Sequence, residues 1–354
     1  MCKQLQTSSF SLPYVTSSHL KLSATFNKSA SSFIVEELPL YSFWGSGQHL
    51  ICKVIKQGKN TQEVVQLIGQ HFKLHSKDIG VAGQKDKEGL TSQYISLSVG
   101  AKFPLETAKK IAAAISSGPS LLVTPIGFHN NKIRTGHLAG NKFIISLENV
   151  AEDDLSIAQQ LIAEIAQNGV PNFYGKQRFG VEHKNIKRGL QFLSGERKNN
   201  GHWQNKFISS AYQSYLFNRW LAARISDGLY NKIIPGDIFF NIGKSRPLTT
   251  EIISDAHREF AEHKIVYTGP IYGPQMLSPK DEALAREESI LLEEQIDKSL
   301  FNTKETPGAR REALLYPAIN VTNYDKGHQK LQLCFTLPPG AYATIVLREF
   351  LKND

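Results

Sequence analysis

An aspartate in a short, charged segment is the residue of this sequence best suited to chemistry. Asp86 stands between Lys85 and Lys87 in the segment GQKDKEG, which begins and ends with glycine. Two neighbouring ammonium groups that point inward would favour the ionised carboxylate. A carboxylate displayed on a loop between strands can act as a nucleophile or as a base. A solvated charged hairpin has the same pattern, so the spacing leaves both interpretations open.

Two later segments combine basic and aromatic side chains. The first places histidine, lysine and arginine at residues 129–137, ahead of GNKF at residues 140–143, and the second is NFYGKQRFG at residues 172–180. Both compositions suit RNA, because cations contact phosphates and aromatic rings stack on bases. An ordinary polar loop also explains the first segment, and a packed interdomain hinge also explains the second. Arg310 and Arg311 are either a further RNA contact or a plain surface pair.

The composition excludes several classes of protein. The chain has 354 residues, of which 41% are hydrophobic and 21% charged, so global disorder is excluded. No apolar run reaches the roughly 18 residues of a membrane span, and the N-terminal residues lack the apolar core of a secretory signal. Three scattered cysteines, Cys2, Cys52 and Cys334, offer neither a disulfide framework nor a paired-cysteine zinc site. We therefore expect an intracellular protein.

The net charge and the absence of several known motifs bear on the possible chemistry. The chain carries 41 Lys+Arg against 32 Asp+Glu, a net charge of +9, which points weakly to nucleic acid and equally aids solubility. The sequence contains no GxxxxGK[ST], GxGxxG, HExxH or GxSxG motif. ATP, nicotinamide and zinc chemistry therefore have no support in the sequence.

The hydrophobic pattern predicts an α+β fold. Apolar runs and alternation predict strands at residues 33–37, 49–56, 79–82, 92–98, 121–128 and 141–147, with helices after Asn60, at 105–115 and from about 154 to Gly169. Residues 170–309 are mostly helical by pattern, with candidates at 184–193, 207–225, 249–263 and 279–299. The hydrophobic pattern again predicts strands at 314–321 and 331–337, followed by a closing helix at 342–351. One sheet-based domain interrupted by a helical insertion is the simplest interpretation.

Five collinear motifs resemble a known family, the TruD family of tRNA pseudouridine synthases. The segment AGQKDK at residues 82–87, followed by Thr91 and Gln93, is similar to its signature loop. The other matching segments are FIVEE at 33–37 with GSGQH at 45–49, GNKF at 140–143, GVPNFYGKQRFG at 169–180 and LPPGAYAT at 337–344. The resemblance therefore extends along almost the whole chain.

The resemblance implies a fold and a reaction. It implies a pseudouridine-synthase catalytic domain with a mixed sheet, formed by residues 1–168 and 310–354 and interrupted by a mostly helical TRUD insertion domain at 169–309. It also implies isomerisation of uridine to pseudouridine in tRNA, at position thirteen of the D arm in the bacterial-type members. A uridine inside a folded tRNA must leave its stack to react, so base flipping is implied. No cofactor, no metal and no protein partner are expected, and we expect a cytoplasmic monomer that acts on tRNA.

The resemblance also assigns roles to residues. Asp86 matches the catalytic aspartate, which either attacks the sugar or removes a sugar proton to give a glycal-like intermediate; the family does not settle which. The aromatic and polar positions that match the substrate-binding set are Phe33, Asn141, Phe143 and Tyr342, the last standing where some relatives carry Phe. Candidate RNA-binding residues, for phosphate contacts or for supporting the loop, are Lys85, Arg134, Lys176, Arg178, Arg310 and Arg348. Two departures from the family pattern, at residues 88–89 and 130–132, bear on the choice of target.

Two other function classes stay open on sequence. A non-catalytic RNA-binding or tRNA-folding protein would use the same basic surface but would not need Asp86. A glycoside hydrolase would require paired carboxylates across a cleft, for which Glu36, Glu37 and Asp86 are the candidates.

Overall fold

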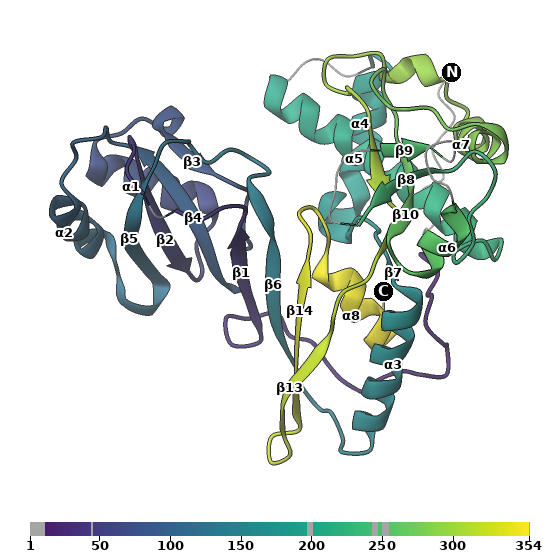
Figure 1. Ribbon diagram of the computed structural model, residues 1–354, viewed down its shortest axis with the longest axis horizontal. Helices are drawn as coiled ribbons and strands as arrows, with labels where there is room; N and C mark the ends of the chain where they lie inside the picture. Colours follow the sequence, from purple (N-terminus) through teal and green to yellow (C-terminus); the bar gives the residue numbers. More distant parts are fainter. Residues whose placement is uncertain (1–10, 44, 197–200, 243–246, 250–254, 354) are drawn as a thin grey trace. The chain divides into compact units, whose positions relative to one another are not determined.

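The fold is described from a computed structural model, which places residues 11–43, 45–196, 201–242, 247–249 and 255–353. The chain forms two compact units (Figure 1). Unit 2 comprises Leu22–Ala158 and Ala318–Gly340, and unit 1 comprises the described residues of Met1–Lys21, Gln159–Pro317 and Ala341–Asp354. Cys2 lies outside the described residues.

Unit 2 is built on one mixed sheet, as the sequence predicts. Its strand order is β13-β14-β6-β1-β4-β2-β5, with β3 paired to β4. β1 and β4 run parallel, and the other neighbouring strands run antiparallel. The strands are β1 (Phe33–Pro39), β2 (His49–Lys56), β3 (Ile79–Val81), β4 (Leu90–Ser98), β5 (Leu121–His129), β6 (Leu138–Leu147), β13 (Asn320–Asp325) and β14 (Lys330–Leu337).

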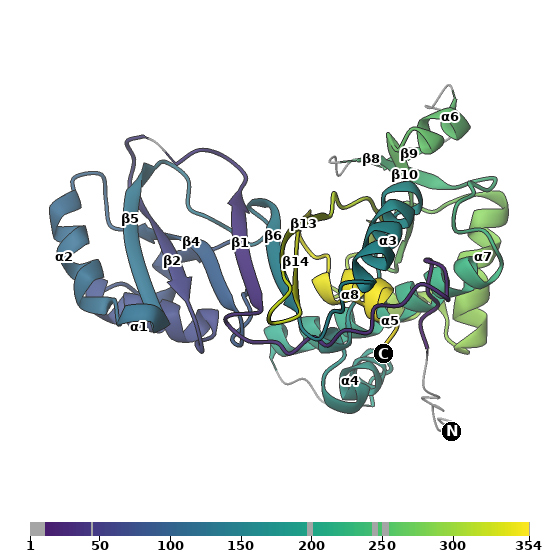
Figure 2. The same cartoon turned by 90° about the horizontal axis from the view of Figure 1, so that it is seen from below.

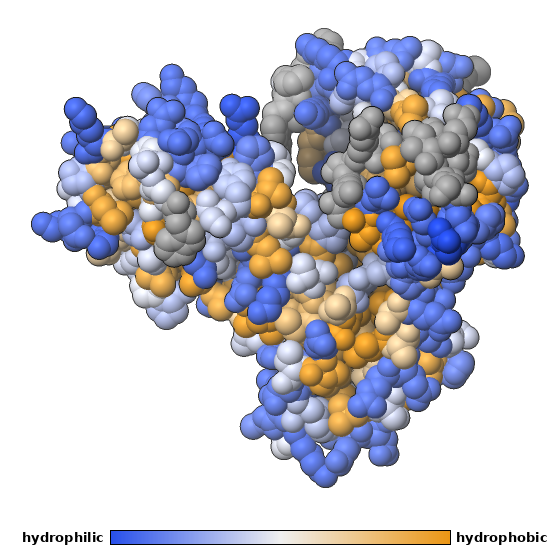
Figure 3. Space-filling view, viewed as in Figure 1, coloured by the Kyte–Doolittle hydropathy of each residue, from blue (hydrophilic) through white to orange (hydrophobic). Residues whose placement is uncertain are grey.

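Two helices cover part of one face of this sheet (Figure 2). α1 (Thr61–Phe72) begins at Asn60, whose side chain accepts from the Glu63 amide while the Glu63 side chain accepts from the Asn60 amide. This capping box satisfies two amides that the first helical turn leaves free. Val64, Ile68 and Phe72 of α1 pack with α2 (Leu105–Ile115) and with alternate residues of β2 to form a core. The outer surface of unit 2 seen in Figure 3 is largely hydrophilic, with small hydrophobic groups between.

Unit 1 is richer in helices but has sheets of its own. A four-stranded sheet has the order β11-β10-β8-β9, and β7 pairs with β12. The helices are α3 (Asp154–Asn168), which starts in unit 2, α4 (Lys184–Leu193), α5 (His202–Ser226), α6 (Ala256–Ala261), α7 (Asp281–Glu293) and α8 (Ala343–Leu351). The strands are β7 (Val170–Pro171), β8 (Ile238–Asn241), β9 (Pro247–Thr249), β10 (Ile265–Ile271), β11 (Ala309–Glu312) and β12 (Leu314–Leu315).

The sheet of unit 1 is the main feature that the sequence pattern missed. β10 is buried along almost its whole length, so it reads IVYTGPI, without the polar alternation that marks a half-exposed strand. The helix predicted at 249–263 is present only as α6, since β9 ends at Thr249 and residues 250–254 lie outside the described part of the chain. The strands predicted between residues 33 and 147, the strand at 331–337 and the closing helix are confirmed, with ends shifted by up to three residues. The strand predicted at 314–321 is wrong as one element, because Leu314–Leu315 form β12 and a separate strand, β13, begins at Asn320.

Candidate active site

The strand register brings the predicted substrate-binding residues of unit 2 to one sheet face. Across β1 and β6, Val35 pairs with Phe143 and Glu37 with Asn141. Paired residues point to the same side of a sheet, and alternate residues along a strand share a side. Phe33, Glu37, Asn141 and Phe143 therefore lie on one face. The sequence of β1 and β6 thus provides a platform with aromatic rings beside a carboxylate and an amide.

Asp86 has a counter-ion that the sequence did not indicate. Its Oδ1 lies 2.6 Å from the Nζ of Lys28, and both side chains stay partly exposed, Lys28 at 21% and Asp86 at 34%. The same Nζ lies 4.7 Å from the centroid of the Phe33 ring. Lys28 therefore connects the carboxylate to the aromatic platform. Because Lys28 and Asp86 are separated by 58 positions, no spacing rule could have paired them.

The two lysines next to Asp86 in the sequence pair with other carboxylates. Lys85 Nζ lies 2.9 Å from Glu37 Oε2 and donates to Asn141 Oδ1, and Lys87 Nζ lies 3.9 Å from Glu63 Oε1. The Lys85 side chain is only 6% exposed. Lys85 is therefore corrected from a candidate RNA contact to a buried link between Glu37 and Asn141. Because Asn141 Oδ1 accepts from Lys85, the Asn141 Nδ2 amide remains to donate a hydrogen bond to a substrate.

The aromatic platform consists of packed rings. The Phe143 ring centroid lies 6.0 Å from that of Phe33 and 5.7 Å from that of Phe335 on β14. Phe33 and Phe143 are both buried. Gly89, part of one departure from the family pattern, is required here: a Cβ at this position would lie 2.6 Å from the Phe33 carbonyl oxygen. The glycine therefore lets the Asp86 loop return to the sheet directly against Phe33.

The carboxylate pair proposed for glycoside hydrolysis does not form. Glu37 is buried, accepts from the Tyr94 amide at 3.0 Å and binds Lys85, whereas Glu36 lies 3.4 Å from Lys142. Neighbouring residues of a strand point to opposite faces, so Glu36 and Glu37 are on different sides of the sheet. Neither carboxylate is a free acid opposite Asp86, and the hydrolase alternative loses its structural basis.

The remaining predicted residue of unit 2 is at the surface. Arg134 is exposed in the segment between β5 and β6, and Asn130 and Asn131 beside it are exposed as well. Lys132 donates to the Lys77 carbonyl oxygen. Arg134 therefore keeps an accessible charge for a phosphate, whereas Asn130 and Asn131 offer only neutral amides.

In unit 1, the predicted residues of the two glycine-rich motifs come together. The Tyr342 ring lies 6.0 Å from the Tyr174 ring, and burial is the main cause of a raised Tyr342 pKa. The Arg311 guanidinium lies 3.9 Å from the Tyr174 centroid. Arg178 is half-buried and donates to Ser210 Oγ at 2.7 Å, whereas Lys176 is exposed. Tyr174 thus lies against both Tyr342 and Arg311.

Two arginines are corrected from candidate phosphate contacts to structural groups of unit 1. Arg310 is 3% exposed, and its Nη1 lies 2.7 Å from Oε1 of the equally buried Glu287. Arg348 donates to the carbonyl oxygens of Leu12 and Pro13 and is 6% exposed. A guanidinium that is buried among protein acceptors has no surface to offer to a phosphate.

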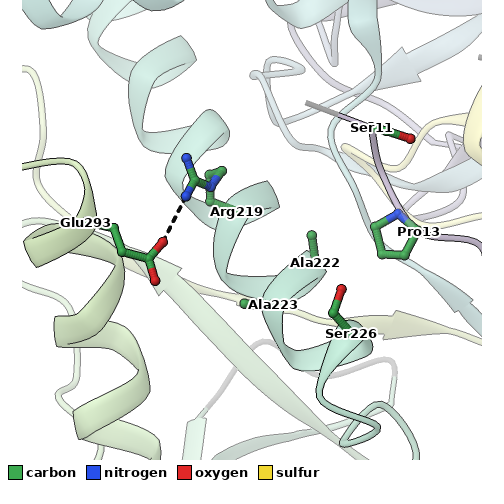
Figure 4. A pocket seen from close by; sticks show the side chains of 7 residues that line it. All are labelled: Ser11, Pro13, Arg219, Ala222, Ala223, Ser226 and Glu293. Carbon is green, nitrogen blue, oxygen red and sulfur yellow. Dashed lines mark hydrogen bonds and ion pairs between the residues drawn. The ribbon is translucent and has the colours of Figure 1, made fainter. Parts of the chain in front are cut away.

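Unit 1 contains a cavity beside α5. This cavity of about 300 Å³ is lined by residues of α5, by Glu293 of α7 and by Ser11 and Pro13 of the N-terminal segment (Figure 4). Its two charged residues, Arg219 and Glu293, form an ion pair of 2.8 Å. Within the part of the chain that the structure describes, no group of three His, Cys, Asp or Glu side chains is arranged to hold a metal. The same described residues include no helix both long and apolar enough to cross a membrane.

Comparisons with known proteins identify the family. The family described as tRNA pseudouridine synthase D (TruD) matches residues 11–199 and 201–350. The chain belongs to the TruD family. A tRNA pseudouridine synthase D of Anaeromyxobacter sp. is 33% identical over 348 residues, covering 96% of both chains, and that of Thermus thermophilus is 32% identical, covering 97% of this chain and 92% of its own.

A solved structure supports the fold. A Methanosarcina mazei protein assigned as a candidate tRNA pseudouridine synthase D has a TM-score of 0.69 and 25% identity, covering 94% of each chain. The α+β fold is thereby confirmed. As a TruD family member the protein is a tRNA pseudouridine synthase, an isomerase that converts uridine to pseudouridine in tRNA.

Proposed function

We propose that this enzyme isomerises uridine thirteen in the D arm of tRNA, with Asp86 as its catalytic residue. The observation that carries the role of Asp86 is its partly exposed carboxylate, paired with Lys28 at 2.6 Å beside the Phe33–Phe143 platform. The position in the tRNA rests on the resemblance to the bacterial-type members of the family.

The reaction requires a group at the ribose and a surface for the base. The N-glycosidic bond breaks, the uracil turns, and a bond forms between C5 and C1′; the proton on C5 leaves and N1 gains one, so no atom is lost. Asp86 serves either by attacking C1′ or by removing a sugar proton, and Lys28 holds the carboxylate in both routes. Phe33 and Phe143 provide an apolar edge against which the detached base can turn. The free amide group of Asn141 is suited to donate to a uracil carbonyl.

The reaction must also take the uridine out of its stack. Flipping a nucleotide costs a few kcal/mol, which contacts to the RNA backbone must offset. The exposed Arg134 and Lys176 and the half-buried Arg178 are the phosphate contacts we propose. We further propose that residues 169–309 are the family's insertion domain and that the enzyme acts in the cytoplasm as a monomer. The proposed steps transfer protons and a glycosyl group and no electrons, so they call for neither cofactor nor metal.

The test is product mapping on unmodified tRNA transcripts. Pseudouridine is located by carbodiimide-dependent stops in primer extension, with the parent protein, Asp86→Asn and Asp153→Asn side by side. Asp153 is an exposed carboxylate of the same unit and is the matched control. We expect a stop at position thirteen with the parent and with Asp153→Asn, and none with Asp86→Asn. A stop elsewhere would refute the target, and product formation by Asp86→Asn at the parent rate would refute the role of Asp86.

A further inference from the structure

A fully buried lysine lies directly beneath the Asp86 loop. Lys56 is the last residue of β2 and has no exposed surface. Its Nζ donates to three carbonyl oxygens, those of Lys59 at 2.8 Å, Lys85 at 3.2 Å and Asp86 at 2.6 Å. An ammonium has three N–H donors, so each finds an acceptor. Two of the three acceptors belong to the catalytic residue and its predecessor.

Other groups of the same segment hold the loop in the same way. The Gly58 amide donates to the Lys87 carbonyl at 3.0 Å, and the Lys85 amide donates to Thr61 Oγ1 at 2.9 Å. Thr61 is itself buried and donates to Gln93 Oε1 at 3.0 Å. Residues 56–61 therefore bind the backbone on both sides of Asp86. The Asp86 side chain takes no part in these bonds and points to Lys28 instead.

We propose that Lys56 is a positioning residue for catalysis: its ammonium fixes the backbone of Asp86 and so aims the carboxylate at the ribose. The inference rests on the proposed role of Asp86. A reacting group must be held close to its productive geometry, and a displacement of about 1 Å costs on the order of 100-fold in rate. Thr61 fixes the adjoining amide but is neutral, so Lys56 is the charged member of this set.

The geometry has a consequence for pH. A neutral amine has two N–H donors and a lone pair, so deprotonated Lys56 leaves one of the three carbonyls without a donor. Burial lowers the Lys56 pKa to about 8; Asp86 and Glu63 act in the opposite direction, and Lys85 lowers it further. The rate should therefore fall as the pH rises through about 8. The Glu63 side chain faces Lys56 from α1, and Lys85 and Asp86 face it from the loop.

The test is a single-turnover measurement on a tRNA transcript carrying [5-³H]uridine, whose tritium is released when C5 bonds to C1′. The variants are Lys56→Met, similar in length but without donors, and Lys53→Met, which removes a charge from the same strand. We expect Lys56→Met to lower the rate constant about 100-fold with little change in the tRNA concentration for half-saturation, and Lys53→Met to keep the parent rate constant. The parent rate should decline above pH 8, and the residual rate of Lys56→Met should not.

Each outcome bears on Lys56 separately from Asp86. A rate constant of Lys56→Met equal to that of the parent, or a decline of its rate above pH 8, would overturn the proposal for Lys56. If Asp86→Asn is inactive at the same time, the proposed role of Asp86 still stands. If Asp86→Asn is active, the proposed function itself fails. Hydrogen exchange of the parent peptide spanning residues 83–89 gives a test that needs no variant. Protection, corrected for the intrinsic rate, should decrease between pH 7 and 9.5, and unchanged protection would overturn the proposal.

Discussion

Removal of the Asp86 counter-ion should slow the reaction without preventing folding. In Lys28→Met the carboxylate loses its 2.6 Å partner while the side chain keeps its length. Two unit charges at this separation attract by roughly 6 kcal/mol at an effective dielectric constant of about 20. Both groups are partly hydrated, so the net value is nearer that of one charge-assisted hydrogen bond, about 1.5–3 kcal/mol. This corresponds to a rate reduced by about 10- to 150-fold.

The assay is single-turnover tritium release at saturating enzyme, which isolates the chemical step from tRNA binding. Lys21→Met is the control, because Lys21 is an exposed lysine of the neighbouring segment. It removes the same charge from the protein and so reports any general loss of attraction for RNA. Thermal unfolding of both variants should match that of the parent within a few degrees. A Lys28→Met rate constant within twofold of the parent would refute the inference that this ion pair holds the catalytic carboxylate.

Two other predictions concern the aromatic platform and a buried carboxyl group. Phe143→Leu keeps apolar volume but removes the ring packed between Phe33 and Phe335, so urea unfolding should show a loss of about 1 kcal/mol. Lost base stacking of about 1–3 kcal/mol should lower the single-turnover rate about 10-fold or more; an equal fall in Phe335→Leu would argue against direct base contact. Burial raises the Glu287 pKa to about 7, well above the ordinary value of a glutamate, so the folded state binds a proton more tightly than the unfolded state. The Glu287 contribution to the free energy of unfolding is then complete below about pH 4.5 and is lost as the pH rises through 7. In Glu287→Gln, the free energy of unfolding measured in urea should therefore depend less on pH between 4.5 and 7.

The sequence by itself determined most elements of unit 2 and the candidate for the reacting group. The apolar run and partial alternation of HLICKVIK predicted β2. The spacing of Val64, Ile68 and Phe72 predicted α1, because a half-buried helix shows its period. The resemblance of AGQKDK to the family signature singled out Asp86 as the candidate catalytic residue. β10 escaped prediction for the opposite reason, since a strand buried on both sides has no polar alternation.

The tertiary structure alone decided which charges surround Asp86. Lys85 and Lys87 are its neighbours in sequence, yet Lys85 binds Glu37 and Lys28 binds Asp86 from 58 positions away. Arg310 and Arg348 are candidate RNA contacts in the sequence, but both are buried among acceptors, as is Lys56. Local pattern governs secondary structure because it depends on residues a few positions apart. The partner of a charge depends on which strands the fold brings side by side, and that information lies in contacts between distant segments.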